Sequence, residues 1–422
     1  MRFAYNLLTY MLLLPYALYW LVRGIGNRSY WHKLPERFGL GYRPLDGCLW
    51  VHAVSVGEVV AATPLIRALM REYPDKTLLV TTVTPTGAAR VTATFGASVE
   101  HSYIPFETPD AINRFFAARK PEIAMITETE IWPNLYHGCG VRNIPLVLIS
   151  ARISPKSVKS YRKLLPLFRE TLSHGIIIAA QTAADADRFL SLGAASERTR
   201  VTGNIKFDIE LPDSLNDDGR ALREALFPDR PVWIAASTHD GEEALVLDAH
   251  ARVLKAVPDA LLVLVPRHPQ RFGTVRELVE KRGFTLVSRT ERTSVPPDCR
   301  VFLGDTMGEL TLFYAAADAA FVGGSLVEIG GHSLLEPAAV SVAMLAGPFN
   351  FNAQEIADLF VDSGACRLVN DSDALGDTVI ELFGDPGARR RMVDSAADIL
   401  EANRGALSRL LEMVRPLIGE RP

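Results

Sequence analysis

The stretch that decides the fold is "CLWVHAVSVGEVVAA", residues 48–62. It begins as a short apolar run, as expected of a strand covered on both faces, and then passes into a helical pattern. Ser55, Gly57 and Glu58 stand at the turn between the two. The sequence therefore predicts a strand-to-helix corner that carries a carboxylate next to a small, flexible residue.

The same alternation of apolar runs and amphipathic stretches continues through the chain. In the first half the runs are TLLVTTV, EIAMITE, PLVLIS and GIIIAAQ (residues 77–83, 122–128, 145–150 and 175–181). In the second half they are PVWIAAS, ALLVLVP, FTLVSR, RVFLGD, DAAFVGG, SVAMLAG and ACRLV (residues 231–237, 260–266, 284–289, 300–305, 318–324, 341–347 and 365–369). This pattern predicts an α/β fold with two doubly wound parallel sheets, joined by the polar segment 207–220.

Length and composition agree with two domains and exclude several functions. The chain has 422 residues, 48% of them hydrophobic, and a formal net charge of -4. A chain of this length exceeds one ordinary core, and the near-neutral charge does not indicate a nucleic-acid surface. The cysteines at 48, 139, 299 and 366 form no C-x-x-C pair, so we expect buried thiols in a reducing compartment, without a disulfide or zinc site.

The N-terminus has the character of a membrane segment. Residues 4–22 contain no charge and are followed by Arg23, Arg28, Lys33 and Arg37. This length and the basic flank predict a retained anchor with the body of the protein on the cytoplasmic side, rather than a cleaved signal peptide. Pro15 could kink the helix, so a shallow, interfacial insertion is the alternative.

Ionisable residues of the first half follow the expected strands. Ligands bind outside the carboxyl ends of parallel strands, which makes these residues candidates for a site. Glu58 could complement a helix dipole or accept a proton from a substrate hydroxyl. Glu128 and Glu130 could repel each other and raise a pKa, or pair with Arg152. Lys206 could be a solvated lysine or bind an anion.

In the second half, several expected strand ends gather groups suited to an anion. Asp240 and Glu243 have the spacing of a capping box, and Arg267 and His268 directly follow a strand. The segments 304–310 and 321–337 are rich in glycine and lead into helices. Backbone N–H groups in such segments bind phosphate, so we expect the N–H groups near Gly323 and Gly324 to face an anion.

Two alternatives accompany that expectation. The glycines at 323, 324, 330 and 331 could serve tight turns alone, and Glu336 could accept hydrogen bonds from ribose hydroxyls. Neither a P-loop motif nor a dinucleotide-binding G-x-G-x-x-G is present. We also expect no Asp-x-Asp motif that would hold a metal ion between phosphates. The second half is therefore interpreted as an anion site, and P-loop and dinucleotide-binding functions are disfavoured.

The motifs, taken in order behind the hydrophobic N-terminus, resemble those of one family. They are HAVSVGE, TETEIWPN, ISAR, GNIKFD, STHDGEE, PRHPQRF, GDTMGEL and VGGS with GGHSLLEP, beginning at residues 52, 127, 149, 203, 237, 266, 304, 322 and 330. Together they resemble the 3-deoxy-D-manno-octulosonic acid (Kdo) transferases of Gram-negative bacteria. The match spans nearly the whole chain.

The resemblance implies a GT-B fold, in which two Rossmann-like domains face a cleft. The implied divisions are a membrane anchor with a basic segment (1–34), an acceptor-binding domain (35–206), a linker (207–220), a donor-binding domain (221–400) and a C-terminal helix packing back on the first domain (401–422). The implied reaction transfers Kdo from CMP-Kdo to the lipid A precursor, tetraacyldisaccharide 1,4'-bisphosphate, at the cytoplasmic face of the inner membrane. The expected partners are therefore CMP-Kdo, the lipid A precursor and membrane lipid, with no nucleic acid, cofactor or metal.

The resemblance also assigns residues. The general base falls on Glu58, and the transition-state stabilising groups fall on Glu128 and Lys206. The implied donor-binding residues are Arg267, His268, Met307, Gly308, Glu309, Ser333, Leu334, Leu335 and Glu336. Ser55, Gly57, Glu130, Arg152, Gly323 and Gly324 are expected to support the site. The chain departs from the family at Ser333-Leu334, where members commonly have Asn-Pro. An Asn amide is therefore not present to make the family's contact, although a Ser at a helix N-cap can still accept a backbone N–H.

Two other functions fit a GT-B fold. One is a nucleotide-sugar epimerase or a different GT-B transferase, which the hydrophobic anchor disfavours. The other is a non-catalytic nucleotide-sugar binding or scaffold protein at the membrane, which the presence of Glu58, Glu128 and Lys206 disfavours.

Overall fold

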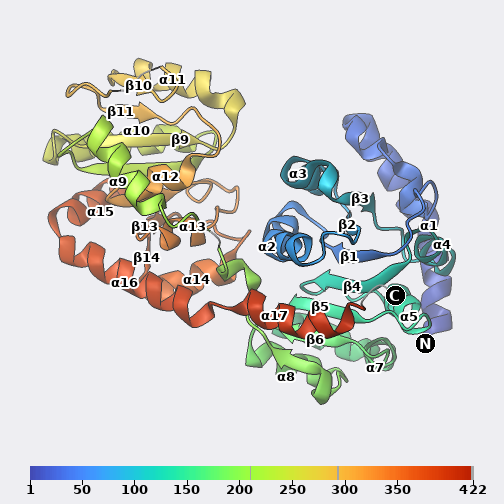
Figure 1. The fold of residues 1–422 in the computed structure, drawn as a ribbon. Helices are drawn as coiled ribbons and strands as arrows, with labels where there is room; N and C mark the ends of the chain where they lie inside the picture. The colour runs from blue at the N-terminus through green and yellow to red at the C-terminus, as the bar shows by residue number, and fades with distance from the viewer. Residues whose placement is uncertain (210, 292–293, 420–422) are drawn as a thin grey trace. The chain divides into compact units, whose positions relative to one another are not determined.

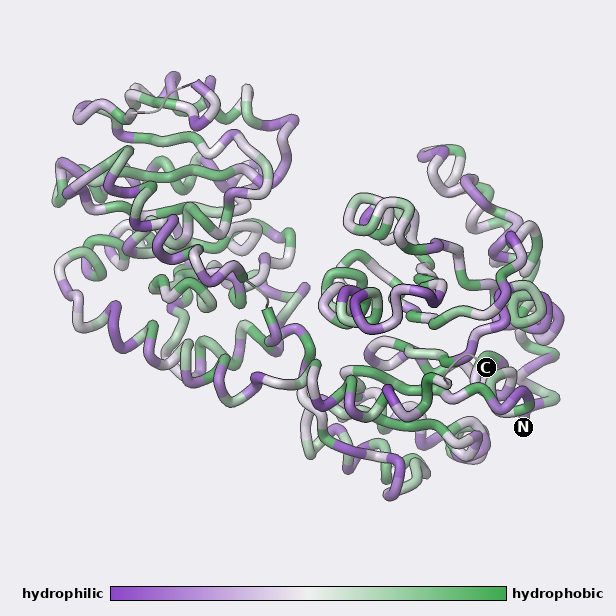
Figure 2. The backbone as a smooth tube through the Cα atoms, in the orientation of Figure 1, coloured by the Kyte–Doolittle hydropathy of each residue, from purple (hydrophilic) through white to green (hydrophobic). Residues whose placement is uncertain are grey.

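The computed structural model describes residues 1–209, 211–291 and 294–419. The chain forms two compact units, of which unit 1 contains Met1–Asp208 and the C-terminal segment from Asn403, and unit 2 contains Ile209–Ala402. Each unit is built around its own parallel sheet with helices on both faces (Figure 1). Figure 2 shows that the strands are predominantly hydrophobic, as the continuous apolar runs predict.

The sheet of unit 1 has seven strands in the order β3-β2-β1-β4-β5-β6-β7. The strands are β1 (Cys48–His52), β2 (Leu78–Thr82), β3 (Glu100–Tyr103), β4 (Pro121–Thr127), β5 (Leu146–Ala151), β6 (Ile177–Ala180) and β7 (Thr199–Val201). In the central pairing, Val51 of β1 lies beside Val80 of β2 and Met125 of β4. The strand order reverses between β1 and β4, which makes their carboxyl ends the switch point where ligands bind in such sheets.

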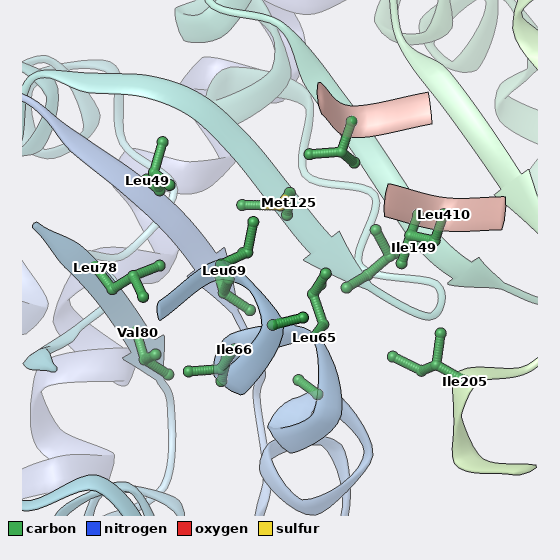
Figure 3. Packing of buried hydrophobic residues seen from close by; sticks show 14 of the residues in the cluster. Leu49, Leu65, Ile66, Leu69, Leu78, Val80, Met125, Ile149, Ile205 and Leu410 are labelled. Carbon is green, nitrogen blue, oxygen red and sulfur yellow. The ribbon is translucent and has the colours of Figure 1, made fainter. Parts of the chain in front are cut away.

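Two apolar clusters cover the faces of this sheet. One contains side chains of α2 (Val56–Glu72), α3 (Pro85–Phe95) and α17 (Ala406–Val414). The other contains side chains of α4 (Pro109–Arg119), α5 (Pro133–Gly140), α6 (Pro155–Tyr161), α7 (Leu165–Leu172) and α8 (Ala183–Ser191). Figure 3 shows how Leu410 of α17 joins Leu65, Ile149 and Ile205 in the first cluster. The end of the chain therefore completes the core of the unit in which the chain begins.

Unit 2 has a second seven-stranded sheet, in the order β10-β11-β9-β8-β12-β13-β14. Its strands are β8 (Val232–Thr238), β9 (Leu261–Pro266), β10 (Leu286–Ser288), β11 (Val301–Leu303), β12 (Ala319–Val322), β13 (Ala343–Ala346) and β14 (Cys366–Leu368). Its helices are α9 (Leu215–Leu226), α10 (Glu242–Ala256), α11 (Phe272–Lys281), α12 (Leu310–Ala315), α13 (Leu335–Ala339), α14 (Gln354–Asp362), α15 (Ser372–Gly384) and α16 (Pro386–Asn403). The switch point of this sheet lies between β8 and β12.

The N-terminal helix α1 (Arg2–Gly26) belongs to unit 1 and lies against it. The ring of Tyr16 stacks on Phe106 with centroids 4.2 Å apart, and Trp20 is 4% exposed. The short helices η1 (Arg28–Trp31) and η2 (Leu34–Phe38) follow. Among the described residues, α1 is the one helix long and apolar enough to cross a membrane by length and composition.

The expected fold class is confirmed, with differences in detail. Strand β3 was not among the predicted runs, because its sequence, EHSY, is polar at its first three positions. The segment 207–220 was predicted to be an aperiodic linker, but helix α9 begins within it at Leu215. Residue 210 of that segment and residues 420–422 of the expected C-terminal helix lie outside the described residues. The four cysteines are free and buried, as expected.

Candidate active site

The switch point of unit 1 brings two carboxylates to neighbouring strand ends. Glu58 lies in the first turn of α2, which follows β1, and Glu128 directly follows β4. Strands β1 and β4 are adjacent, with His52 beside Ile126. The position of Glu58 results from the corner itself, since Ser55 is the N-cap of α2 and its side chain accepts the backbone N–H of Glu58.

Three donors hold the side chain of Glu58. One carboxylate oxygen accepts the backbone N–H of Val54 at 2.8 Å and the hydroxyl of Thr127 at 2.5 Å. The other accepts the hydroxyl of Ser55 at 3.3 Å. Burial raises the pKa of Glu58 above its ordinary value, and the nearby charge of Glu128 also raises it. The three hydrogen bonds lower the pKa but do not cancel the effect of burial. The result is an oriented carboxylate of increased basicity.

Glu128 is held between two cations. Its carboxylate accepts from Lys206 Nζ at 2.7 Å and from Arg152 Nε at 3.0 Å. Burial by itself would raise the pKa of Glu128, but these cations hold it below its ordinary value. The pair with Arg152 was the structural alternative for this residue, and the structure adds Lys206 to it. Glu128 is thus an ionised group within a charged cluster.

Lys206 reaches this cluster from the last segment before unit 2. It lies in the short helix η6 (Ile205–Phe207), whose start is capped by the Asn204 side chain accepting the Lys206 N–H at 3.0 Å. Its side chain is 27% exposed, so the lysine is not simply solvated. Glu128 and Lys206 are far apart in sequence, so only the folding of unit 1 brings them together.

Glu130 lies near the same cluster but has different partners. Its carboxylate accepts the indole N–H of Trp132 at 2.7 Å. Burial raises the pKa of Glu130 to about 6, and the charges of Glu58 and Glu128 contribute to this shift. The mutual repulsion expected from the sequence is therefore present, but it acts on Glu130. Gly57 leaves open space beside Glu58, since a Cβ there would meet nothing closer than Ser55 Oγ at 3.9 Å.

In unit 2, a buried carboxylate binds the backbone of the glycine-rich segment that follows β12. Glu242, the first residue of α10, accepts the backbone N–H groups of Gly324, Ser325 and Leu326 at 2.6, 3.0 and 2.9 Å. The N–H of Gly323 donates to Ala236 O at 2.8 Å. Both N–H groups are therefore bonded within the protein, that of Gly324 to the carboxylate of Glu242, and are not free for the phosphate that the sequence predicted.

Beside this segment, a group of imidazoles follows strands β8 and β9. His239 and His332 approach with their Nε2 atoms 2.9 Å apart, and the ring of His268 lies 5.3 Å from that of His239. Arg267 and His268 are exposed, as a ligand-binding pair would be. Burial, together with the charges of His239 and Arg267, lowers the pKa of His332 to about 4. His332 is therefore neutral at pH 7, and the positive charge at this edge of the sheet comes from Arg267.

The other expected donor-binding residues lie at strand ends of the same sheet. Met307 is 65% exposed and Gly308 has a positive φ of 87°. Glu309 is the N-cap residue of α12 and pairs with Arg289 at 2.8 Å. The hydrogen bonds from Arg289 and Thr306 lower the pKa of Glu309. These residues follow β11, whose carboxyl end shares one sheet edge with those of β9 and β12.

The segment 333–336 leads into α13. Ser333 precedes the N-cap residue Leu334 and accepts the N–H of Leu335 at 3.3 Å, so its hydroxyl retains a capping role. Leu334 and Leu335 are buried, whereas Glu336 is half-buried. The charge of Glu336 acts on the buried phenol of Tyr314. Glu336 therefore stands where a partly accessible carboxylate could accept hydroxyl donors.

Several residues of these sites were missed at the sequence level. Thr127 and His239 lie within the quoted motifs, but a Thr at a strand end and an isolated histidine carry no specific spacing signal. Asp240 was expected to cap a helix, yet the N-cap of α10 is Gly241 with φ 83°. Asp240 instead pairs with Arg271 at 2.8 Å, which also binds the buried Glu243.

The expectation about Asp-x-Asp motifs needs a correction. The chain does contain Asp-x-Asp sequences, at 185–187 and 371–373. Asp185 accepts the N–H of Ile153 at 3.0 Å and binds Arg188, while Asp371 caps α15 by accepting the N–H of Ala374. Both serve local structure. Among the described residues, no cluster of three or more His, Cys, Asp or Glu side chains could hold a metal ion.

Comparisons with known proteins place these features in a family. Residues 32–209 match the family model of 3-deoxy-D-manno-octulosonic-acid transferase (kdotransferase), and residues 243–398 match that of glycosyl transferases group 1. A 3-deoxy-D-manno-octulosonic acid transferase of Haemophilus influenzae is 41% identical, with 93% of each chain covered. A 3-deoxy-D-manno-octulosonic acid transferase of Bordetella pertussis is 36% identical over 91% of this chain and 92% of its own.

Solved structures resemble all or part of the chain. A UDP-GlcNAc 2-epimerase from Neisseria meningitidis covers 87% of this chain and 100% of its own with a TM-score of 0.54, but at 15% identity the likeness is one of fold. The C-terminal CMP-Kdo binding domain of an Acinetobacter baumannii protein is 34% identical and covers 44% of this chain and 98% of its own, with a TM-score of 0.43. The two doubly wound sheets and the matched family models define a glycosyltransferase of the GT-B class.

Within that class the identity is specific. Since relatives at 41% and 36% identity span nearly the whole chain, the protein belongs to the family of 3-deoxy-D-manno-octulosonic acid (Kdo) transferases. The resemblance carried by the motifs is thereby confirmed.

Proposed function

We propose that the protein transfers Kdo from CMP-Kdo to the lipid A precursor, tetraacyldisaccharide 1,4'-bisphosphate, in lipopolysaccharide core assembly. The observation that carries this proposal is the placement of Glu58 and the Glu128–Lys206 pair at the switch point of unit 1, in a chain of the Kdo transferase family. The epimerase alternative has support from fold alone, and a non-catalytic role leaves these charges without a purpose.

Glu58 acts as the general base in this proposal. The donors on its carboxylate fix its orientation, and burial makes it a stronger base than an exposed glutamate. It removes the proton from the attacking sugar hydroxyl of the acceptor while the bond between Kdo and CMP breaks. Attack on the face opposite the leaving group inverts the configuration in a single displacement. The open space at Gly57 leaves room for the acceptor next to the base.

The remaining charges stabilise the transition state and the leaving group. In unit 1, Lys206, oriented by Glu128, stabilises the transition state, and in unit 2 Arg267 supplies positive charge for the CMP phosphate as it gains charge. Met307–Glu309 and Ser333–Glu336, with His268, bind the cytidylate. With these cations in place the transfer is proposed to proceed without a metal ion, so activity should persist in excess EDTA.

The acceptor and its location follow from the same family. An acceptor with four acyl chains resides in a membrane, and α1 provides an apolar surface on the unit that carries Glu58. We therefore place the protein at the cytoplasmic face of the inner membrane, with CMP-Kdo supplied from the cytoplasm.

The direct test is incubation of the full chain with CMP-Kdo and the tetraacylated disaccharide, followed by mass measurement of the lipid. The expected product is heavier by one or more Kdo residues, and CMP is released only when acceptor is present. CMP release without acceptor, or an unchanged lipid mass, contradicts the proposal.

The role of Glu58 is tested by Glu58→Gln. Removing a general base should lower kcat by about 10² to 10⁴ while CMP-Kdo binding stays nearly intact, because the donor residues lie in unit 2. The matched control is Glu72→Gln at the other end of the same helix, where the carboxylate pairs with Arg415. Full activity in Glu58→Gln would refute the assignment.

A further inference from the structure

Helix α1 is amphipathic, but its polar and aromatic side faces unit 1 and its aliphatic side faces outward. The positions covered by unit 1 recur at helical spacing along its whole length and are Arg2, Tyr5, Asn6, Thr9, Leu13, Tyr16, Ala17, Trp20 and Gly24. Most of these carry polar groups or aromatic rings. A helix that turns its polar and aromatic side toward the protein leaves its aliphatic side outside.

The covered side makes specific polar and aromatic contacts with unit 1. The hydroxyl of Tyr5 donates to Glu107 at 2.5 Å, and that of Tyr10, at the edge of this side, donates to Asp110 at 2.7 Å. The guanidinium of Arg37 lies 3.5 Å from the ring centroid of Trp20. These contacts extend from the first turn of α1 to its last turns. The helix is therefore docked lengthwise on the unit.

The opposite side is exposed and aliphatic. Its large exposed residues are aliphatic apart from Phe3 and Tyr19, whose hydroxyl accepts from Arg23 within the helix; the aliphatic ones are Leu7, Leu8, Met11, Leu12, Leu14, Leu18, Leu21, Val22 and Ile25. Phe3 is 84% exposed and Leu14 is 78% exposed. A contiguous apolar surface of this size is not stable in water, and its aliphatic side chains offer no hydrogen-bonding group that would specify a protein partner.

The docked geometry decides how this surface meets a membrane. At 1.5 Å per residue, the 25 residues of α1 extend about 37 Å, which is long enough to cross a hydrocarbon core roughly 30 Å thick. If α1 crossed the bilayer while docked, the exposed Asp110 beside Tyr10 would lie near the bilayer centre, where a carboxylate costs several kcal/mol. A helix lying in the interface buries its apolar side only about 5 to 10 Å and avoids this cost.

We propose that α1 does not cross the membrane but lies in its plane, with the exposed aliphatic side in the acyl region and unit 1 on one side. The occupant of this surface is an anionic lipid leaflet, because exposed cations lie at the end of the helix, with Arg23 in its last turn and Arg28 and Lys33 directly after it. This deepens the membrane location in the proposed function, but it rests on the contacts of α1 and not on the transfer reaction.

The first experiment measures on which side of the membrane the N-terminus lies. A cysteine is added before Met1 of the full chain, and inverted inner-membrane vesicles are treated with a membrane-impermeant maleimide; the native cysteines are buried. A cysteine at the exposed Lys281 in unit 2 marks the cytoplasmic side. We expect both cysteines to react equally before and after detergent lysis. An N-terminal cysteine that reacts only after lysis means that α1 crosses, which overturns the proposal.

The second experiment measures lipid binding by the aliphatic side. Binding to phosphatidylethanolamine–phosphatidylglycerol vesicles should weaken at least tenfold in Leu14→Glu and remain unchanged in the control Leu368→Glu, an exposed leucine of unit 2. Since Leu14 is exposed, both variants should fold, as thermal unfolding will show. Unchanged binding in Leu14→Glu overturns the proposal, as does self-association that requires Leu14 while vesicle binding does not. Neither experiment measures Kdo transfer, so failure of the proposed reaction is distinguishable.

Discussion

At the residue scale, Glu128 combines an unfavourable backbone with strong side-chain partners. Its φ of 54° lies in the left-handed region, which costs a non-glycine residue about 1 kcal/mol or more. The ion pairs with Lys206 and Arg152 hold it there, together with its N–H bond to Ile149 O at 2.9 Å. Such strain commonly occurs at functional sites, and here it points a carboxylate at the lysine proposed to act in catalysis.

Glu107 is a second informative residue, because it connects α1 with the segment after the site. It is 6% exposed and accepts from Tyr5, from the N–H of Asn134 at 3.2 Å and from that of Leu135 at 2.8 Å. The last two groups belong to the first turn of α5, which follows Glu130 and Trp132. Burial raises the pKa of Glu107 to about 7.

This carboxyl predicts a pH dependence of stability. A folded-state pKa raised above the unfolded value means that the folded state holds the proton more tightly. The contribution of Glu107 to the free energy of unfolding should therefore fall as pH rises from about 4.5 to about 7, by up to about 3 kcal/mol, and level off above. Glu107→Gln should remove this slope, whereas Asp110→Asn should keep it. Denaturation midpoints measured from pH 4.5 to 8 test this, and parallel curves for wild type and Glu107→Gln would contradict it.

At the scale of elements, Glu242 links helix α10 to the segment that follows strand β12. Its carboxylate is buried and accepts N–H groups of three successive residues, 324–326, as well as that of His239 at 3.2 Å. The glycine-rich segment is therefore held by an internal anion. This places the proposed donor-binding segment without using a ligand.

Glu242→Gln should loosen that segment. An amide has one oxygen to accept and turns an NH₂ group toward backbone donors, leaving at least one buried N–H without a partner, at about 1 to 3 kcal/mol. We expect a lower melting temperature and at least tenfold weaker CMP binding by calorimetry. Glu277→Gln, an exposed residue of α11, is the control and should change neither. Wild-type CMP affinity in Glu242→Gln would show that the segment does not depend on this residue.

At the scale of the whole molecule, the chain closes the core of unit 1 only at its end. The carboxylate of Asp208 accepts the N–H groups of Gly405 at 2.7 Å and Leu407 at 2.5 Å, which holds the start of α17. Leu410 is fully buried against side chains of α2 and β5 (Figure 3). Unit 1 is therefore incomplete until the last helix has been synthesised.

Leu410→Ala should destabilise unit 1 although the residue lies beyond unit 2 in sequence. Loss of a buried leucine side chain costs about 2 to 5 kcal/mol. Tryptophan fluorescence reports this unit selectively, because Trp233 is the only tryptophan of the sequence within Ile209–Ala402. We expect the thermal transition of unit 1 to occur at a clearly lower temperature in Leu410→Ala. The control is Ser408→Ala, which changes an exposed residue of the same helix. An unchanged transition would mean that α17 is not part of this core.

The sequence by itself determined the fold class and the strand ends at which charged residues gather, because apolar runs, helical periodicity and corner residues such as Ser55 act over a few neighbouring positions. It also indicated the family, through motifs in a particular order, and a relative 41% identical over nearly the whole chain confirms that family. It missed β3, whose edge position tolerates polar residues, and misjudged Asp240, since Gly241 caps the helix instead.

Only the tertiary structure decided which of these groups are partners. Glu128 and Lys206 meet at 2.7 Å, Glu242 takes N–H groups that appeared free for phosphate, and the polar side of α1 turns toward unit 1. The physical reason is that hydrogen bonds and ion pairs between distant segments depend on sheet order and on what else is buried beside them. Periodicity along the chain shows that a residue is covered, but not by which residue.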